Sequence, residues 1–145
     1  MTAVLVTALV FGASAQNNMQ DKLKDKDVPT AVQTSFKTAF PNAKDAEWKM
    51  KEGMYKVMFE VDDVDQMAAF DASGKMLSKG TKIQESELPA AVSSAIKGAY
   101  ANKNIDEVYR VEKDGGINYL VKLNGMDKKI MYSADGMVVK EKMNH

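Results

Sequence analysis

Apolar residues recur at helical spacing in two segments of the chain that lie 60 positions apart. In each segment they fall four residues apart, which places them on one face of a helix, and a proline stands in the first turn, where its missing N–H costs nothing. The matching residues are Val28 and Leu88, Pro29 and Pro89, Val32 and Val92, Phe36 and Ile96, and Phe40 and Tyr100. We therefore predict two amphipathic helices, each of which opens one copy of a tandem repeat.

Alternation of polar and apolar residues follows each predicted helix and indicates half-buried strands. It is clearest in 55–61 of the first copy and 117–123 of the second, and glycine-containing turns separate the strands. The full set of predicted strands is 47–51, 55–61, 67–70, 75–79, 106–113, 117–123, 129–132 and 137–142. Each copy, 28–80 or 88–143, is thus predicted to be a helix followed by four antiparallel strands, with 81–87 as the linker.

The chain begins with an apolar run, 3–11, followed by the small residues Ala13 and Ala15. The run is too short to span a membrane, which takes about 20 apolar residues, and it is typical of a secretory signal peptide, 1–15. We therefore expect an exported protein, periplasmic or secreted, with no stable membrane insertion after cleavage. The alternative is a buried N-terminal element of the mature fold. Signal peptides normally begin with a basic residue, and its absence here favours a start codon upstream of Met1.

The predicted fold class is α+β, with both helices packed on one face of an antiparallel sheet. The polar segment 16–27 is predicted to be a flexible arm that precedes this fold. One helix covers too little sheet to stabilise a single copy, so we expect the two copies to pack as one unit. Trp48 is expected to seal the first helix against the sheet, rather than to serve as an exposed binding anchor, and Tyr109 is expected to replace it in the second copy.

Composition narrows the possible functions. The 145 residues are 45% hydrophobic and 28% charged, which is typical of a soluble globular domain. Twenty basic and twenty acidic residues balance, so the net charge gives no reason to expect nucleic acid as a partner. The lack of cysteine excludes disulfides and thiol chemistry, and the single histidine, His145, excludes histidine-based acid–base catalysis or a multi-histidine metal site. We expect no enzymatic activity and no cofactor.

One set of motifs resembles a known family. Its residues are Val28-Pro29, Val32, Phe36, Phe40-Pro41, Trp48, Tyr55-Lys56-Val57 and Asp71-x-x-Gly74. With these motifs, residues 28–142 resemble the PepSY-like family of small exported bacterial proteins, whose fold is similar to that of the β-lactamase inhibitor protein. The second copy departs from the pattern because it lacks the tryptophan and the proline after the helix. The resemblance implies export, a tandem α+β fold, and a role in binding or inhibiting other envelope proteins, with no catalytic residues.

A partner-binding site is expected on the sheet face that the helices leave uncovered. The alternation of the strands directs five candidate residues to that face, and they are Lys56, Met58, Leu120, Lys122 and Met131. Methionine side chains repack around varied surfaces, so this face would suit an envelope or secreted protein or peptide. The alternative is that the methionines, eleven in the whole chain, fill gaps in the core or a contact between the copies.

A second hypothesis is a periplasmic carrier of a small ligand or of calcium. Asp62, Asp63, Asp65 and Asp71 could supply the oxygen ligands that calcium prefers. The twelve-residue calcium loop is absent, so a solvated turn is the simpler interpretation and no metal ligand is assigned. An enzyme built from carboxylates that only the fold brings together is the third hypothesis.

Overall fold

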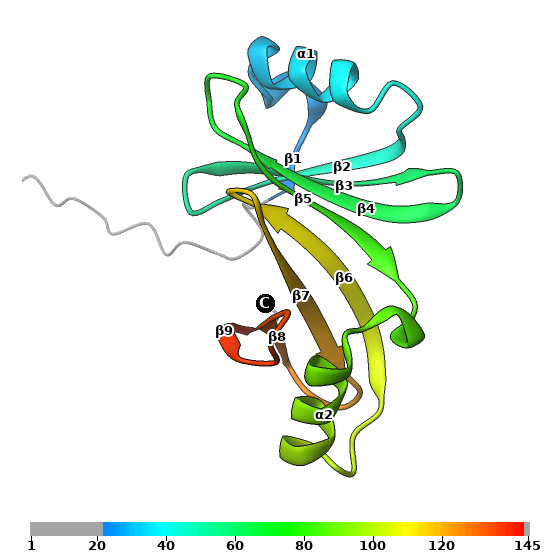
Figure 1. The fold of residues 1–145 in the computed structure, drawn as a ribbon. Helices are drawn as coiled ribbons and strands as arrows, with labels where there is room; N and C mark the ends of the chain where they lie inside the picture. Colours follow the sequence, from blue (N-terminus) through cyan, green and yellow to red (C-terminus); the bar gives the residue numbers. More distant parts are fainter. Residues whose placement is uncertain (1–21, 144–145) are drawn as a thin grey trace, which may run out of the picture.

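A computed structural model describes residues 22–143, so the predicted signal peptide and residues 16–21 of the predicted arm lie outside the described residues. Nine strands form a single antiparallel sheet in which each strand pairs with the next along the chain, and two helices lie against it (Figure 1). The strands are β1 Lys22–Leu23, β2 Lys44–Lys51, β3 Met54–Val61, β4 Val64–Phe70, β5 Met76–Ile83, β6 Ile105–Lys113, β7 Gly116–Leu123, β8 Lys128–Ser133 and β9 Val138–Met143. The α+β class is confirmed.

The helices are α1 Thr30–Ala39 and α2 Ala90–Ala99, and each follows a short 3-10 turn, η2 Asp25–Asp27 or η3 Glu85–Glu87. A proline stands immediately before each helix, with φ of −54° in the first and −55° in the second, close to the value that its ring imposes. Within residues 22–143, neither helix has the length and apolar character needed to cross a bilayer.

Both helices pack on the same face of the sheet. Val57 of β3 and Val121 of β7 point to this face, and so do the residues that pair with them across the neighbouring strands. Two apolar clusters result. Core one consists of the buried residues Val28, Val32, Phe36, Trp48, Val57, Phe59, Ala68 and Phe70. Core two consists of Leu88, Val92, Ile96, Val108, Tyr119, Val121, Leu123, Ile130 and Tyr132.

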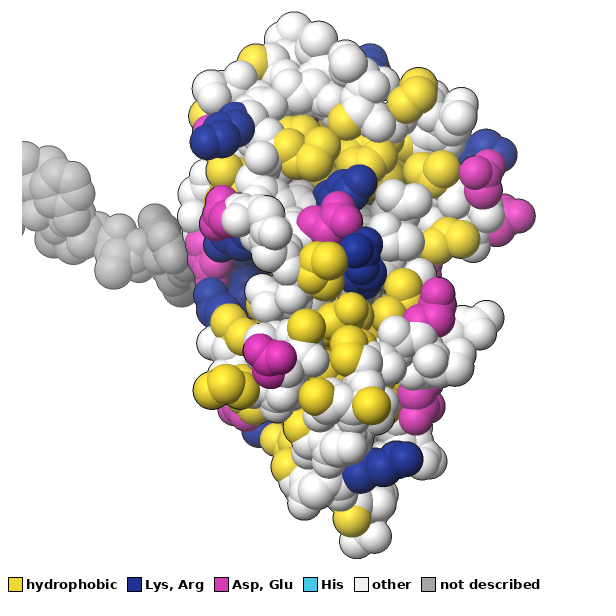
Figure 2. Space-filling view, viewed as in Figure 1, with side chains coloured by type: hydrophobic (Ala, Val, Ile, Leu, Met, Phe, Trp, Pro, Cys, Tyr) yellow, Lys and Arg dark blue, Asp and Glu magenta, His cyan; other side chains and the backbone are white. Residues whose placement is uncertain are grey.

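The two copies form one continuous sheet, as expected of copies that pack as one unit, but each has its own core. A polar strip on the helix face of β5 and β6 separates the cores, and Figure 2 shows it as charged side chains between two apolar areas. Lys79 lies 3.5 Å from a carboxylate oxygen of Glu112, and Arg110 donates a hydrogen bond of 2.9 Å to the same side chain. Charged side chains at these positions stay hydrated, so no apolar contact joins the two helices.

Two predicted connecting segments have defined structure. In the described part of the predicted arm 16–27, residues 22–23 pair with β2 and residues 25–27 form η2. The linker 81–87 consists of the end of β5 and of η3, and therefore has a defined backbone. The amphipathic pattern of the helices and long strands does not extend into these short polar segments, and backbone hydrogen bonds with neighbouring elements order them instead.

Trp48 is buried in core one, as predicted, but its counterpart in the second copy is not Tyr109. Trp48 pairs with Val57, and the equivalent pair in the second copy is Val108 with Val121. Tyr109 is the next residue along β6, so it points to the opposite face of the sheet. Matching the two aromatic residues shifted the alignment by one residue, which reverses the side-chain direction in a strand.

The glycine turns of the two copies hold the sheet against the helices. Gly74 has φ of +89° and Gly136 has φ of +82°, and a β-carbon at Gly74 would come within 2.6 Å of the carbonyl oxygen of Ala31 in α1. A β-carbon at Gly136 would meet the carbonyl oxygen of Ala91 in α2 in the same way. The repeated glycine therefore serves both the turn conformation and the close approach of helix and hairpin.

Candidate functional site

The sheet face opposite the helices carries all five predicted site residues. The register continues the alternation from strand to strand, so Lys56 and Met58 of β3 lie on the same face as Leu120 and Lys122 of β7 and Met131 of β8. We refer to this side of the sheet as the lysine face. Leu120 and Met131 are directly paired. Lys56 and Met58 lie on the other half of the face, four strands away.

An apolar band crosses the middle of the lysine face. Met58 pairs with Met67 on the next strand, Met67 pairs with Gly80, and Gly80 pairs with Val111. The next row of paired residues is Tyr109, Leu120 and Met131. A β-carbon on Gly80 would come within 2.7 Å of the Met67 side chain, so this glycine makes room for the methionine. Met58 is 38% exposed, whereas Tyr109 is 3% exposed, so the band runs from an accessible end into a covered centre.

The lysine face curves until its two ends approach each other. In a flat sheet β3 and β9 would be about 29 Å apart, from six strand spacings of roughly 4.8 Å. Yet Lys142 of β9 lies 3.9 Å from a carboxylate oxygen of Glu52, in the turn between β2 and β3. The face is therefore concave, whereas the sequence predicted only that the helices leave it uncovered. The right-handed twist of an antiparallel sheet accumulates over nine strands and produces this curvature.

Lysines from both copies meet across this concavity. Burial, followed by the positive charge of Lys142, lowers the pKa of Lys56 to about 8. Burial also lowers the pKa of Lys129 on β8; the negative charge of Glu107 opposes this shift, and the positive charges of Lys122, Lys49 and Lys51 add to it. Each cation therefore lies in a partly dehydrated place with other cations near it. Such an arrangement favours an anionic group as a neighbour.

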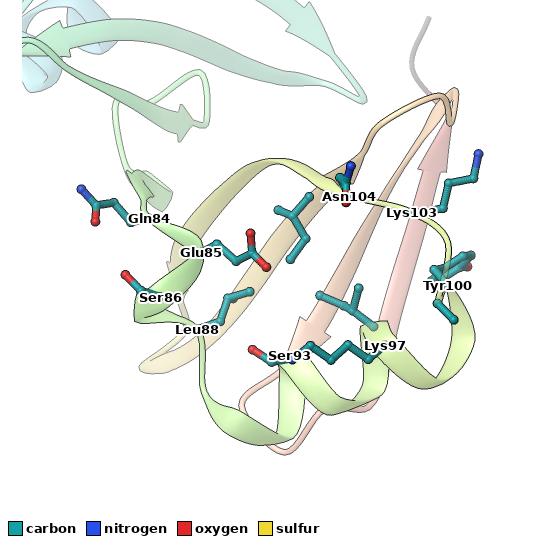
Figure 3. Close-up of a pocket in the computed structure, with 12 residues that line it drawn as sticks. Gln84, Glu85, Ser86, Leu88, Ser93, Lys97, Tyr100, Lys103 and Asn104 are labelled. Atoms are coloured by element: carbon teal, nitrogen blue, oxygen red, sulfur yellow. The ribbon is translucent and has the colours of Figure 1, made fainter.

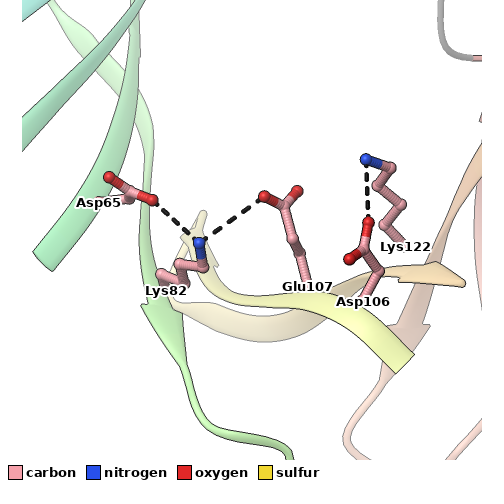
Figure 4. Close-up of polar contacts among 5 residues, drawn as sticks. All are labelled: Asp65, Lys82, Asp106, Glu107 and Lys122. Atoms are coloured by element: carbon pink, nitrogen blue, oxygen red, sulfur yellow. Dashed lines mark hydrogen bonds and ion pairs between the residues drawn. The ribbon is translucent and has the colours of Figure 1, made fainter. Parts of the chain in front are cut away.

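Two other lysines of this face are already paired, as Figure 4 shows. Lys82 donates a hydrogen bond of 3.0 Å to Asp65 and lies 3.7 Å from Glu107, and the bond to Asp65 raises its pKa. Lys122, one of the predicted site residues, lies 3.1 Å from Asp106, and this contact raises its pKa. Within residues 22–143, Lys56 and Lys129 have no carboxylate within 4.0 Å, and so they differ from these two.

The predicted acidic cluster does not assemble. Asp62 and Asp63 form the turn between β3 and β4, and Asp65 is paired with Lys82. Asp71 accepts hydrogen bonds from the Ser73 hydroxyl at 2.6 Å and from the backbone of its own turn, and the Ser73 hydroxyl is the main reason that the pKa of Asp71 is lowered. In the part of the chain that the structure describes, no group of three acidic, histidine or cysteine residues is placed to hold a metal ion.

Sequence reasoning did not identify Lys129, Lys142 or Tyr109 as members of this face. The alternation of β8 contained the signal for Lys129, since it lies two residues before Met131 on the same side of the strand. For Lys142 there was no signal, because its position opposite Glu52 depends on the curvature of the whole sheet.

The chain matches one family model twice. The family is described as "Putative beta-lactamase-inhibitor-like, PepSY-like", and the matches cover residues 14–78 and 53–140. The first match contains the whole of the first copy up to β5, and the second extends from β3 into β9. No functionally curated protein matches the chain closely enough to count as a relative.

Several solved structures from Bacteroides share the fold. A BLIP-like protein of Bacteroides fragilis NCTC 9343 is 26% identical and has a TM-score of 0.59, over 79% of this chain and 86% of that one. A protein of Bacteroides eggerthii DSM 20697, described as periplasmic, is 20% identical with a TM-score of 0.69, over 80% and 88% of the two chains. A DUF2874 family protein of Bacteroides ovatus ATCC 8483 is 24% identical with a TM-score of 0.63, over 79% and 86%.

Proposed function

Because this chain belongs to the beta-lactamase-inhibitor-like, PepSY-like family, we propose that it is an exported binding protein that acts without catalysis. Its partner is an envelope or secreted protein or peptide, and the binding surface is the lysine face. The chemistry of the face suits an acidic, extended segment with apolar residues among its carboxylates. The apolar residues would lie on the band around Met58, Leu120 and Met131, and the carboxylates would lie beside the lysines.

The observation that carries this proposal is the pair of partly buried lysines that, in the part of the chain the structure describes, have no carboxylate within 4.0 Å. The protein has no net charge, but Lys56 and Lys129 sit in a concavity with further lysines from both copies around them. Dehydrating a cation near other cations is unfavourable, and a bound carboxylate would remove that cost by supplying the missing opposite charge. Because Lys122 is already paired with Asp106, it would help to orient the bound partner rather than supply an unpaired positive charge.

The apolar part of the proposal is tested by replacing Met58 and Met131 with aspartate and capturing partners from an envelope extract. We expect the double variant to lose the partner that the wild-type protein retains. The matched control is Val64→Asp with Ile117→Asp, because these two side chains are as exposed as Met58, at 38% each, and point to the helix face. Equal capture by both double variants and the wild type would exclude the lysine face as the site.

The electrostatic part is tested by charge reversal. The double variant Lys56→Glu with Lys129→Glu should release the captured partner at low ionic strength. The control is Lys26→Glu with Lys37→Glu, which makes the same change in net charge near and on α1 and should retain the partner. Binding by the wild type should weaken as salt rises from about 0.05 to 0.5 M, because exposed ionic contacts are screened. Binding that is unaffected by both salt and charge reversal would contradict an acidic partner.

Export is tested separately. The structural neighbour from Bacteroides eggerthii that is described as periplasmic supports it, and so does the predicted signal peptide 1–15. We expect the full chain, expressed in a Bacteroides host, to be recovered from the periplasm or medium with a new N-terminus at Gln16. Recovery of the uncut chain from the cytoplasm would contradict the assignment.

A further inference from the structure

A hollow of about 790 Å³ lies between α2, η3 and the start of β6, on the helix side of the sheet and away from the lysine face. Its apolar wall contains Leu88, Ile96 and Ile105, and its polar residues include Glu85 and Ser93 (Figure 3). In the close-up, Glu85 extends from η3 over the hollow. The volume lies within the range of about 300–1,000 Å³ that is typical of small-molecule sites.

The tandem repeat shows which polar contacts the first copy makes at the equivalent place. Gln33 of α1 extends toward η2, where its amide nitrogen donates one hydrogen bond of 2.6 Å to the carbonyl oxygen of Asp25 and one of 2.9 Å to that of Val28. One carboxamide group thus connects the helix, the 3-10 turn and the segment between them. The first copy supplies this group from its own sequence.

The second copy has the two equivalent backbone carbonyl groups but, among the residues that the structure describes, no side-chain amide that donates hydrogen bonds to them. The residues equivalent to Asp25, Val28 and Gln33, 60 positions on, are Glu85, Leu88 and Ser93. The two 3-10 turns have the same backbone hydrogen bond, from Val28 to Asp25 at 3.2 Å and from Leu88 to Glu85 at 3.1 Å, so the carbonyl groups are similarly held. In residues 22–143, no side chain donates a hydrogen bond to the carbonyl oxygen of Glu85 or Leu88, since serine is too short to reach them.

The change of neighbouring side chains adds space. Phe36 and Phe40 of the first copy are replaced by Ile96 and Tyr100. Phe36 lies at the centre of an aromatic cluster, whereas Ile96 has a smaller side chain and forms part of the wall of the hollow. The second copy has therefore lost both a polar group and apolar volume at one location. A ligand that restores both would match this hollow.

We infer that the hollow binds a ligand that ends in a primary carboxamide next to an apolar body. The amide nitrogen carries two N–H groups and would donate them to the carbonyl oxygens of Glu85 and Leu88, as Gln33 does in the first copy. The apolar body would lie against Leu88, Ile96 and Ile105. The ligand is either a small amide or the glutamine side chain of a peptide, and both present the same chemistry.

The test is a titration of the mature chain, from Gln16 onward, with hexanamide, followed by amide NMR shifts in η3 and the first turn of α2. Hexanoate and hexylamine have the same apolar body and serve as comparisons. We expect saturable shifts with hexanamide and at least tenfold weaker binding of hexanoate. The carboxylate oxygens of hexanoate would face the carbonyl oxygens of Glu85 and Leu88, and neither group can donate a hydrogen bond. No shift with hexanamide, or tighter binding of hexylamine, would overturn the inference, the latter because it would identify an ammonium site.

The source of the amide is resolved by a second titration, with a short peptide that has glutamine between leucines and with its glutamate counterpart. Selective binding of the glutamine peptide in addition to hexanamide supports a peptide ligand, and binding of hexanamide alone supports a small amide. Equal binding of both peptides would contradict carboxamide recognition.

A variant places the missing group in the protein itself. Ser93→Gln should reduce the affinity for hexanamide at least tenfold, because the new side chain would occupy the carbonyl groups and the hollow. Ser94→Gln is the matched control, since Ser94 is the adjacent, exposed residue of α2. The chemical-shift pattern of core two reports folding independently, and undiminished binding by a folded Ser93→Gln variant would overturn the inference. The proposed partner site on the lysine face is unaffected by either outcome.

Discussion

The two copies of the repeat have the same backbone plan but differ in how their cores are filled. Core one is aromatic, with Phe36 at its centre and ring centroids at 5.3 Å from Trp48 and 5.0 Å from Phe59. Core two is largely aliphatic, with Ile96 and Val108 in place of Phe36 and Trp48. The helix of the first copy packs on a cluster of rings, whereas a hollow lies beside the helix of the second. The same backbone plan thus accommodates two different sets of side chains.

The largest expected effect is at the centre of core one. Phe36→Ala should lower the free energy of unfolding by about 3–5 kcal/mol, because it removes a buried ring and leaves a cavity among other rings. The matched variant Ile96→Ala should cost less, because its side chain already borders a hollow. Urea denaturation of both variants measures the difference. An Ile96→Ala loss equal to or larger than the Phe36→Ala loss would contradict the contrast between a filled and a hollow copy.

The turns at Gly74 and Gly136 contact α1 and α2 in the same way, so the same substitution should have a similar effect in both copies. Gly74→Ala and Gly136→Ala should each cost roughly 2 kcal/mol or more, since the new β-carbon is strained by a positive φ and collides with a helix carbonyl oxygen. Gly53→Ala is the control, with φ of +73° and no atom within 4 Å of the added carbon. Thermal melts compare the three variants. A Gly53→Ala loss as large as the others would show that φ alone, not the helix contact, determines the cost.

A smaller effect of opposite sign is expected at Tyr132. This residue occupies in core two the position that Phe70 occupies in core one, and within the described residues its buried hydroxyl has no hydrogen-bond partner. Because burying an unpaired hydroxyl is unfavourable, Tyr132→Phe should raise the free energy of unfolding by about 1 kcal/mol. Chemical denaturation measures it, with Tyr119→Phe as the control. A loss of stability on removing the hydroxyl would show that it makes a favourable interaction.

The last effect depends on pH and concerns Lys56, whose counterpart in the second copy is Leu120. The pKa of Lys56 is about 8 in the folded protein and 10.5 ordinarily, so between these values the unfolded chain binds more protons and the contribution of Lys56 to stability rises with pH. Lys56→Leu should therefore be more stable than the wild type near pH 7, and its advantage should shrink by pH 9.5. Melting temperatures at both values test this. A constant difference would contradict the lowered pKa.

Much of the fold was predictable because hydrophobic periodicity is a local property. The four-residue spacing in Val32, Phe36 and Phe40 identified a helix, and the alternation in 55–61 identified a strand and its buried side. The order of the four long strands within each copy followed because short turns favour antiparallel neighbours, whereas the pairing of β5 with β6 across α2 came from the structure. The alignment of Trp48 with Tyr109 was wrong because successive side chains of a strand point to opposite faces of the sheet. An error of one position therefore took Tyr109, on the face away from the helices, for the core residue Val108.

Sequence alone therefore determined the two amphipathic helices, the antiparallel strands and the side of the sheet on which Lys56, Met58, Leu120, Lys122 and Met131 lie. Only the tertiary structure decided that this side is concave, because twist accumulates over nine strands and brings Lys142 to Glu52. It also decided that the copies have separate cores and that a hollow lies between α2, η3 and the start of β6. Such features depend on distances between elements, and periodicity carries no information about those distances.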